Sequence, residues 1–317
     1  EHQHKLVKKF LGDMRAVATA QVLIEAKVLE VSLLDEFSAG IDWGSVKLTG
    51  FANVSADFSS PTAGTGVTAG TIAKDIPDSH TVVITAGLRR KPDESRLDLI
   101  NRNVDLFLDL LAQVKAAGLK PTTNLVVVSN PVDILTHLAV ERSGLDWRRV
   151  IGLGTQLDTA RLNSHLARRL NLPATQVKAL LLGEHGDTMV PIWSSATVAG
   201  LPLAQWPGFT PAMEREVFEE TKTAGATMIK LKGGSGFAVG VSIREVVESL
   251  LLDSRKVLPV STLQQGLYGI RDICLSVATV VGCGGAREQI EVPISPREQV
   301  ALQNSARVLK DILEQVR

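Results

Sequence analysis

The chain has few cysteines, few aromatic residues and no surplus of charge, and each shortage excludes a class of protein. Cys274 and Cys283 are the two cysteines in 317 residues. They cannot form a disulfide framework, and their spacing is not that of a zinc site, so we expect a reducing compartment and no metal. Lys and Arg number 34, as do Asp and Glu, and there are 8 Phe, 4 Trp and 1 Tyr. A neutral chain with so few aromatic residues is not expected to bind nucleic acid.

A long apolar run is also missing. No stretch of about 18 apolar residues could cross a bilayer, and the first residues, EHQHKLVKKF, lack the apolar core of a signal peptide. We therefore expect a cytoplasmic protein without membrane contact. The length predicts about two domains, and 44% hydrophobic with 21% charged residues is typical of a soluble globular protein.

Short apolar runs alternate with helical patterns from about residue 75 to residue 150. The runs TVVITAG (81–87) and LVVVSNP (125–131) each precede a helical pattern, near 96–117 and 132–143. Strands that alternate with helices are typical of a parallel sheet wound with helices. We therefore expect a doubly wound α/β fold here.

The pattern after Val150 is mixed and predicts a second domain of the α+β type. Its last helix begins at Pro296, with Ser295 as the N-cap and Glu298 at the capping-box position. The other expected elements are helices near 158–170, 211–230 and 240–254, and strands near 256–260 and 273–281.

The N-terminal part of the chain differs in composition from the rest. Residues 20–32, AQVLIEAKVLEVS, are rich in partly alternating Val, Leu and Ile, which predicts one long strand. Residues 43–70 are rich in Gly, Ser, Thr and Ala and carry almost no charge, which predicts short strands and loops.

A histidine between two glycines is the sharpest chemical signal. It lies in GEHGD (183–187), directly after the apolar run 179–182, so a strand that ends there would present His185 on a loop. Histidine titrates near neutral pH and can donate and accept a proton in one turnover. The alternative is a surface turn that contains a histidine.

A second cluster combines a carboxylate with a guanidinium. Asp158 and Arg161 are three residues apart at the start of a predicted helix, which places them on one face. Asp158 could hold the His185 ring in one tautomer, and Arg161 could bind a carboxylate through two hydrogen bonds. An ordinary ion pair on the helix surface is the alternative.

A basic loop and an asparagine complete the candidate site. The segment GLRRKPDESR (87–96) has four cations in eight positions, so it is either a solvated loop or one that closes over an anion and brings Arg96 to a carbonyl oxygen. Asn130 follows a predicted strand at the edge where open parallel sheets bind ligands.

Residues 75–317 resemble the L-lactate/malate dehydrogenase family through motifs in the same order. They are TVVITAG, RKPDESRLDLINRN, VVVSNPVDILTHLA, GLGTQLDTARL, GEHGDTMVPIWSSATVAGLPL and LPVSTLQQGLYGIRDICLSVATVVG.

This resemblance assigns roles to the candidate residues. It implies that His185 is the proton donor and acceptor, that Asp158 is its partner and that Arg161 binds the substrate carboxylate. Arg96 would polarise the C2 carbonyl, and Asn130 would contact both substrate and nicotinamide ribose. Hydride would pass between the nicotinamide C4 and the substrate C2.

The resemblance also implies a Rossmann-type nucleotide domain, NAD as cofactor and a homo-oligomer, either a dimer or a tetramer. The cofactor would contact Gly87, Val128 and Asn130. The partner would be a small 2-oxo or 2-hydroxy acid.

The substrate is contested within the motifs. Arg90 stands where the family has glutamine in lactate-type and arginine in malate-type enzymes, and a second guanidinium suits the second carboxylate of oxaloacetate. Glu94, Glu184, the GTQLDTAR segment and IWS after the histidine resemble the lactate-type branch. Ser235 falls where that branch usually has threonine. We favour pyruvate and L-lactate, with malate and oxaloacetate as the alternative.

The family's glycine-rich phosphate turn has no clear counterpart. The candidate at 64–70, GTGVTAG, has the wrong last spacing and follows no clear strand. Asp35 and Glu36 follow the strand predicted at 20–32 and could stand in for the acidic residue that binds the ribose, but no glycine turn precedes that strand. Cofactor affinity is expected to be severely weakened.

Residues 6–46 instead resemble a periplasmic segment of bacterial outer-membrane secretins, through AQVLIEAKVLEVS followed by DEFSAGIDW. This predicts a helix near 5–18 and then a strand.

The expected division is 1–72 as an atypical, secretin-like segment, 73–152 as the rest of the dinucleotide-binding domain and 153–317 as the substrate domain. A fusion, a divergent enzyme, an assembly protein of the secretin class and an inactive dehydrogenase-like scaffold remain open.

Overall fold

The structure is a computed structural model, and it describes residues 27–28, 70–88, 94–232 and 236–316. These residues fall within one compact unit of the chain. The helix predicted near 5–18 and the loops predicted at 43–69 lie outside the described residues.

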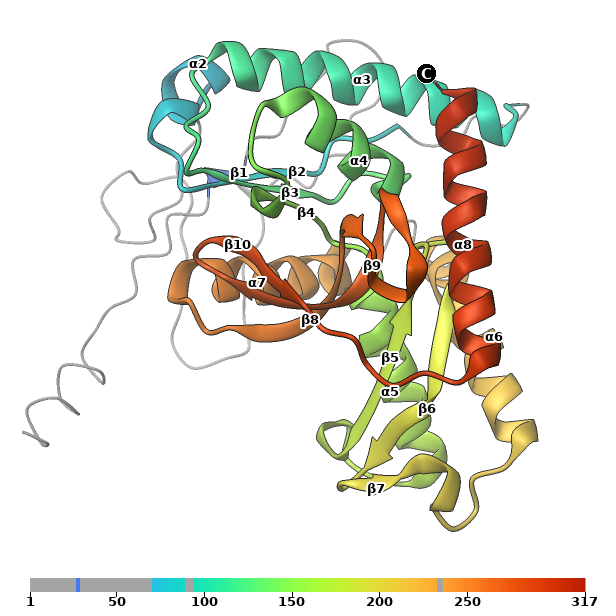
Figure 1. The fold of residues 1–317 in the computed structure, drawn as a ribbon. Helices are drawn as coiled ribbons and strands as arrows, with labels where there is room; N and C mark the ends of the chain where they lie inside the picture. Colours follow the sequence, from blue (N-terminus) through green and yellow to red (C-terminus); the bar gives the residue numbers. More distant parts are fainter. Residues whose placement is uncertain (1–26, 29–69, 89–93, 233–235, 317) are drawn as a thin grey trace, which may run out of the picture. The chain divides into compact units, whose positions relative to one another are not determined.

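A seven-stranded mixed sheet forms the centre of this unit, in the order β1-β2-β3-β4-β8-β9-β10 (Figure 1). Strands β1 to β4 are parallel, and the remaining strands pair in antiparallel fashion. The strands are β1 (Lys27–Val28), β2 (Thr81–Ile84), β3 (Asn124–Val127), β4 (Val150–Gly152), β8 (Lys256–Gln265), β9 (Arg271–Gly282) and β10 (Gly285–Gln289).

Among the described strands, β1 is the outermost and lies beside β2. Lys27 pairs with Val82 and Val28 with Val83, in parallel register. These two residues come from the strand predicted at 20–32, and that prediction is confirmed for them alone, since the rest of 20–32 lies outside the described residues. The N-terminal part of the chain therefore contributes to the same sheet as TVVITAG.

Helices cover both faces of the sheet because its strands alternate their side chains. Val82 and Ile84 pack into a core with α3 (Arg96–Ala116) and α4 (Val132–Ser143), whereas Val83 packs on the other face against α7 (Gly236–Leu252). The parallel strands are buried on both faces, as apolar runs such as TVVI require. The prediction of a doubly wound α/β fold is confirmed.

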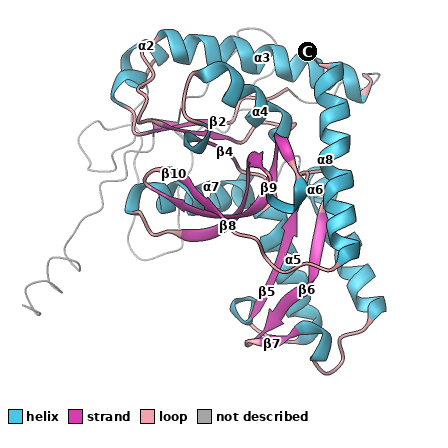
Figure 2. Ribbon diagram, viewed as in Figure 1, coloured by secondary structure: helices cyan, strands magenta, loops and turns pink. Residues whose placement is uncertain are grey.

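A second, three-stranded antiparallel sheet lies beside the first (Figure 2). It consists of β5 (Val177–Leu182), β6 (Val190–Val198) and β7 (Leu201–Pro202). Its core includes side chains of α5 (Gln156–Leu170) and α6 (Pro211–Lys232). A bridge between Gly183 and Ser276 of β9 joins the two sheets.

The last helix, α8 (Pro296–Gln315), begins as predicted. The Ser295 hydroxyl accepts the Glu298 N–H, and the Glu298 carboxylate accepts the Ser295 N–H, which is a complete capping box. No helix within the described ranges is long and apolar enough to cross a bilayer. The remaining short helices are α2 (Ile72–Asp75), η1 (Ile76–Asp78), η2 (Trp147–Arg149), η3 (Ala174–Gln176), η4 (Leu203–Gln205) and η5 (Leu267–Gly269).

Candidate active site

The structure brings His185, Asp158 and Arg161 together at the turn after β5. Asp158 is the third residue of α5, and its side chain is buried. Its Oδ2 lies 2.5 Å from Nδ1 of His185, and its Oδ1 accepts a hydrogen bond of 3.1 Å from Nη1 of Arg161. Because the carboxylate is shared between the ring and the guanidinium, both cations are held at one point.

The charges at this point stabilise one another. Burial opposes a charge on the His185 ring, but the Asp158 carboxylate raises the pKa of His185 above its ordinary value. Burial likewise opposes ionisation of Asp158, but the His185 ring and Arg161 hold the pKa of its carboxyl below the ordinary value. The pair therefore favours an imidazolium beside a carboxylate, which is a proton donor ready for use near neutral pH.

A second carboxylate, from α4, holds the main chain of the histidine. The N–H of His185 donates to Oδ2 of Asp133 over 2.7 Å. Asp133 is buried, and burial raises the pKa of its carboxyl to about 6. The sequence did not single out Asp133, although an acidic residue in the first turn of a helix that follows a predicted strand was available as a signal.

The turn that carries His185 is fixed at both ends. Gly183 has a φ of +88°, and a Cβ there would lie 2.8 Å from the Ser305 hydroxyl of α8, so only glycine fits. The N–H of Glu184 donates to the same hydroxyl over 2.8 Å. The Glu184 carboxylate accepts the N–H of Thr188 at 3.1 Å and its hydroxyl at 2.5 Å. These contacts explain the conformation of the GEHGD motif.

Arg96 lies against the far side of this turn. Its Nη1 is 2.7 Å from Oδ2 of Asp187, its Nη2 is 3.6 Å from Oε1 of Glu184, and its side chain is 60% exposed. Both carboxylates flank His185 in the sequence. The structure therefore places Arg96 next to the histidine turn, but its guanidinium contacts two carboxylates there.

Asn130, Val128 and Gly87 lie at the carboxyl ends of β3 and β2, the same edge of the parallel sheet. Asn130 is exposed and Val128 half-buried. Gly87 is exposed too, and the one described atom that a Cβ there would meet is Oδ1 of Asn103, at 3.7 Å. The same Asn103 amide holds the chain in place by accepting the N–H of Leu88 over 2.7 Å. Among the described residues, these three lie at the carboxyl ends of parallel strands, where open α/β sheets bind ligands, and this position fits the nicotinamide end of a dinucleotide.

Several predicted site residues lie outside the described residues. They are Arg90, Ser235, the acidic candidates Asp35 and Glu36, and the glycine candidate 64–70 except for Gly70. Apart from Lys27 and Val28, so does the secretin-like segment 6–46.

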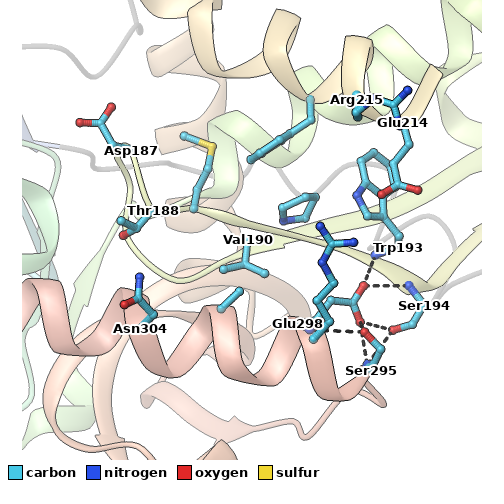
Figure 3. A pocket seen from close by; sticks show the side chains of 15 residues that line it. Asp187, Thr188, Val190, Trp193, Ser194, Glu214, Arg215, Ser295, Glu298 and Asn304 are labelled. Atoms are coloured by element: carbon cyan, nitrogen blue, oxygen red, sulfur yellow. Dashed lines mark hydrogen bonds between the residues drawn. The ribbon is translucent and has the colours of Figure 1, made fainter. Parts of the chain in front are cut away.

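A separate hollow of about 640 Å³ opens between β6, α6 and α8 (Figure 3). Asp187 and Thr188 form one end of it, so it begins where the histidine turn ends. At its other end, the Glu298 carboxylate accepts the N–H groups of Trp193, Ser194 and Ser295 over 2.7 to 3.0 Å. That carboxylate is engaged in holding α8 to β6.

Two family models match the chain. The model of the lactate/malate dehydrogenase NAD binding domain matches residues 25–152, and that of the lactate/malate dehydrogenase alpha/beta C-terminal domain matches residues 155–317. The first match begins before β1 and so includes the edge strand of the sheet.

Curated proteins and solved structures agree with these models. The L-lactate dehydrogenase of Synechococcus sp. (strain JA-3-3Ab) is 37% identical over 254 residues, which are 80% of this chain and 82% of the relative. That of Gloeobacter violaceus is 41% identical over 253 residues, 78% of this chain and 76% of the relative. The ligands-bound crystal structure of minor L-lactate dehydrogenase from Enterococcus mundtii superposes with a TM-score of 0.75 at 35% identity, covering 78% of this chain and 79% of that one.

Proposed function

Since the chain belongs to the lactate/malate dehydrogenase family, we propose that it is an NAD-dependent L-2-hydroxyacid dehydrogenase that interconverts pyruvate and L-lactate. The observation that supports this most is the His185 ring held by Asp158 at 2.5 Å, with Arg161 on the same carboxylate. This arrangement supplies a proton and a carboxylate-binding cation at one point, as reduction of a 2-oxo acid requires.

His185 would move the proton through Nε2. Nδ1 faces Asp158, so Nε2 is the ring nitrogen left to exchange a proton with the substrate oxygen. In the reducing direction C2 gains a hydride, the carbonyl oxygen gains the proton of Nε2, and the ring is left neutral. Asp158 stabilises the imidazolium at the start of this step and remains ionised throughout.

The cations would orient the substrate. Arg161, whose side chain is 15% exposed, can bind the substrate carboxylate through its two-pronged guanidinium while one nitrogen stays on Asp158. Arg96 would polarise the C2 carbonyl, which requires its guanidinium to exchange Asp187 for the substrate. Asn130, at the sheet edge, would contact the substrate and the nicotinamide ribose.

Gly87, Val128 and Asn130 would hold the nicotinamide end of NAD. When bound, NAD would supply or accept the hydride. The glycine-rich turn that would bind the pyrophosphate has no clear counterpart in residues 1–70, so we expect the affinity for the cofactor to be severely weakened. We also propose that the chain works as a cytoplasmic homo-oligomer, a dimer or a tetramer.

Substrate choice would depend on Arg90 and Ser235. The L-lactate dehydrogenase names of the relatives support pyruvate, whereas a guanidinium at Arg90 favours the second carboxylate of oxaloacetate. We expect a higher kcat/KM for pyruvate, and we expect Arg90→Gln to lower the activity with oxaloacetate more than that with pyruvate.

NADH oxidation tests the proposal. The full chain should consume NADH with pyruvate, and His185→Asn should lower kcat by about 10²- to 10⁴-fold, the usual contribution of a general acid. NADH titration by fluorescence, without substrate, separates the alternatives: no binding at millimolar NADH would show an inactive scaffold. Binding without turnover of either 2-oxo acid would refute the proposed substrates.

The N-terminal segment needs its own test. We propose the division 1–72, 73–152 and 153–317, with 6–46 similar to a secretin segment. Ring-shaped assemblies in electron micrographs of the full chain would support an assembly role. An ordinary dimer or tetramer that turns over NADH would refute that role.

A further inference from the structure

We propose that Asp133 is a positioning residue for the proton transfer at His185: its carboxylate holds the main chain of the histidine, and its negative charge favours the protonated ring. This inference rests on the proposed function only for its effect on turnover. The effects on the ring and on the main chain can be measured without any reaction.

The geometry supports the first half of the proposal. Asp133 is the second residue of α4, and its Oδ2 accepts the His185 N–H over 2.7 Å across 52 positions of sequence. Asp158, on α5, binds the ring of the same histidine. Two helices thus each supply one carboxylate to His185, one to its main chain and one to its side chain.

The burial of Asp133 supports the second half. The residue is 2% exposed, and within the described part of the chain its Oδ1 has no hydrogen-bond partner at bonding geometry. A buried carboxylate with one unpartnered oxygen is costly, because it loses its hydration without full replacement. A neutral serine or asparagine could also accept the N–H of His185. The hydrogen bond to the main chain therefore does not require the negative charge of Asp133.

The neighbouring groups determine what that charge does. Burial is the largest influence on the pKa of Asp133 and raises it. The Ser261 hydroxyl of β8, which is near the carboxylate but outside hydrogen-bonding geometry, lowers this pKa, as do the N–H and the ring of His185, whereas Glu184 raises it. In return, Asp133 adds to Asp158 in raising the pKa of His185, against burial and against Arg161. Cys274 of β9 is buried nearby, and burial, Asp133 and Glu141 raise the pKa of its thiol, so it stays neutral.

Two substitutions separate the two effects. Asp133→Asn keeps an oxygen for the His185 N–H but removes the charge, and Asp133→Ala removes both. We expect Asp133→Asn to lower the proton affinity of the His185 ring by about three- to tenfold, which is a shift of roughly 0.5 to 1 pH unit in its titration midpoint. The fall in kcat/KM for pyruvate at alkaline pH should move to lower pH by the same amount.

The experiment is an NMR titration of the full chain with ¹⁵N-labelled histidine and no cofactor. His185→Asn assigns the ring signal among the six histidines, and Asp109→Asn, an exposed acidic residue of α3, is the matched control. A midpoint that falls in Asp133→Asn but not in Asp109→Asn supports the proposal. An unchanged midpoint in folded Asp133→Asn overturns the electrostatic role.

Hydrogen exchange of the His185 amide tests the main-chain role. The amide should be protected in the wild type and in Asp133→Asn, and should exchange at least about tenfold faster in Asp133→Ala, where its acceptor is gone. Equal protection in Asp133→Ala overturns the holding role. If Asp133→Ala does not fold, Asp133→Leu, which fills a similar space and offers no acceptor, replaces it with the same expected loss of protection. Absence of turnover in every variant would refute the proposed function but would leave both of these measurements decisive.

Discussion

Asp133 gives the active site a charge at the expense of stability. Its carboxyl is buried, and burial raises its pKa from 3.8 to about 6. Because the folded value lies above the unfolded one, the native state binds more protons between these two pH values, and stability declines as the pH rises through that interval. At neutral pH the protein therefore bears the full loss of stability that ionisation of the buried Asp133 carboxyl causes.

Asp133→Asn should therefore stabilise the protein at neutral pH while it impairs proton transfer. The gain in the free energy of unfolding should approach about 3 kcal/mol above pH 6, from a pKa shift of about two units. It should vanish below about pH 4, because the wild-type carboxyl is then protonated in both the folded and the unfolded state. Thermal unfolding of wild type and variant at pH 7.5 and at pH 4 measures the gain in stability at neutral pH and its disappearance at acidic pH. A lower unfolding temperature at pH 7.5 than that of the wild type would contradict this account.

The helix α8 is fastened to the small sheet by one carboxylate. Glu298 accepts N–H groups from Trp193 and Ser194 of β6 and from Ser295 at its own N-cap. These hydrogen bonds and those from the two serine hydroxyls outweigh burial and hold the pKa of Glu298 below its ordinary value. One side chain thus caps the helix and joins it to the strand that follows the histidine turn.

Glu298→Gln should destabilise the protein by about 1 to 3 kcal/mol at neutral pH, because an amide presents one fewer acceptor to the same donors. Since the folded pKa is lowered, the wild-type advantage is present above the ordinary value of 4.5 and is lost as the pH falls below it. Urea unfolding at pH 7 and pH 4 tests this, with Glu314→Gln, exposed on the same helix, as the control. Equal losses at both pH values would argue against a charge effect.

Elements with a strong local signal could be predicted from the sequence. The helix expected near 96–117 is α3, which begins at Arg96 after the N-cap Ser95. The strand expected at 256–260 is twice as long, because β8 continues to Gln265 through polar residues. Thr262 and Gln264 are buried there, and Nε2 of Gln264 donates to the carbonyl of Thr262 over 2.8 Å. Hydrophobic periodicity cannot detect a buried strand of this kind.

The candidate site could be predicted only where its residues form a local sequence motif. His185 and its glycines form a local motif, and the resemblance to a family paired it with Asp158. Asp133 was missed because a bond from a side chain to a main-chain N–H 52 residues away leaves no local pattern. The contact between Arg96 and Asp187, 91 residues apart, was missed for that reason as well.

At the scale of the whole molecule, the edge strand β1 connects the N-terminal part of the chain to the dehydrogenase fold. Lys27 and Val28 pair with β2 in the parallel order that the rest of the sheet follows. Residues 27–28, which lie within the match to the NAD binding domain of the family, therefore supply the strand next to TVVITAG. Without it, β2 would be the edge strand of the part of the sheet that the structure describes.

Val28→Pro should loosen that edge without unfolding the centre of the sheet. Proline lacks the N–H that a strand donates and restricts the backbone. We expect amides of Thr81–Ile84 to exchange faster with deuterium by about tenfold or more, with Arg271–Gly282 unchanged, by mass spectrometry. Val28→Thr, which keeps a β-branched side chain, is the control. Uniformly faster exchange in both strands would contradict a local role for β1.

The bridge between the two sheets determines how easily the turn that carries His185 can open. Gly183 and Ser276 exchange both main-chain hydrogen bonds, each of 2.9 Å, so the residue two before His185 is anchored to the long strand β9. A turn held by two main-chain hydrogen bonds to an interior strand opens only when both bonds break, which costs more than the fraying of a surface loop. Mild denaturant that disorders surface loops should therefore leave His185 in place.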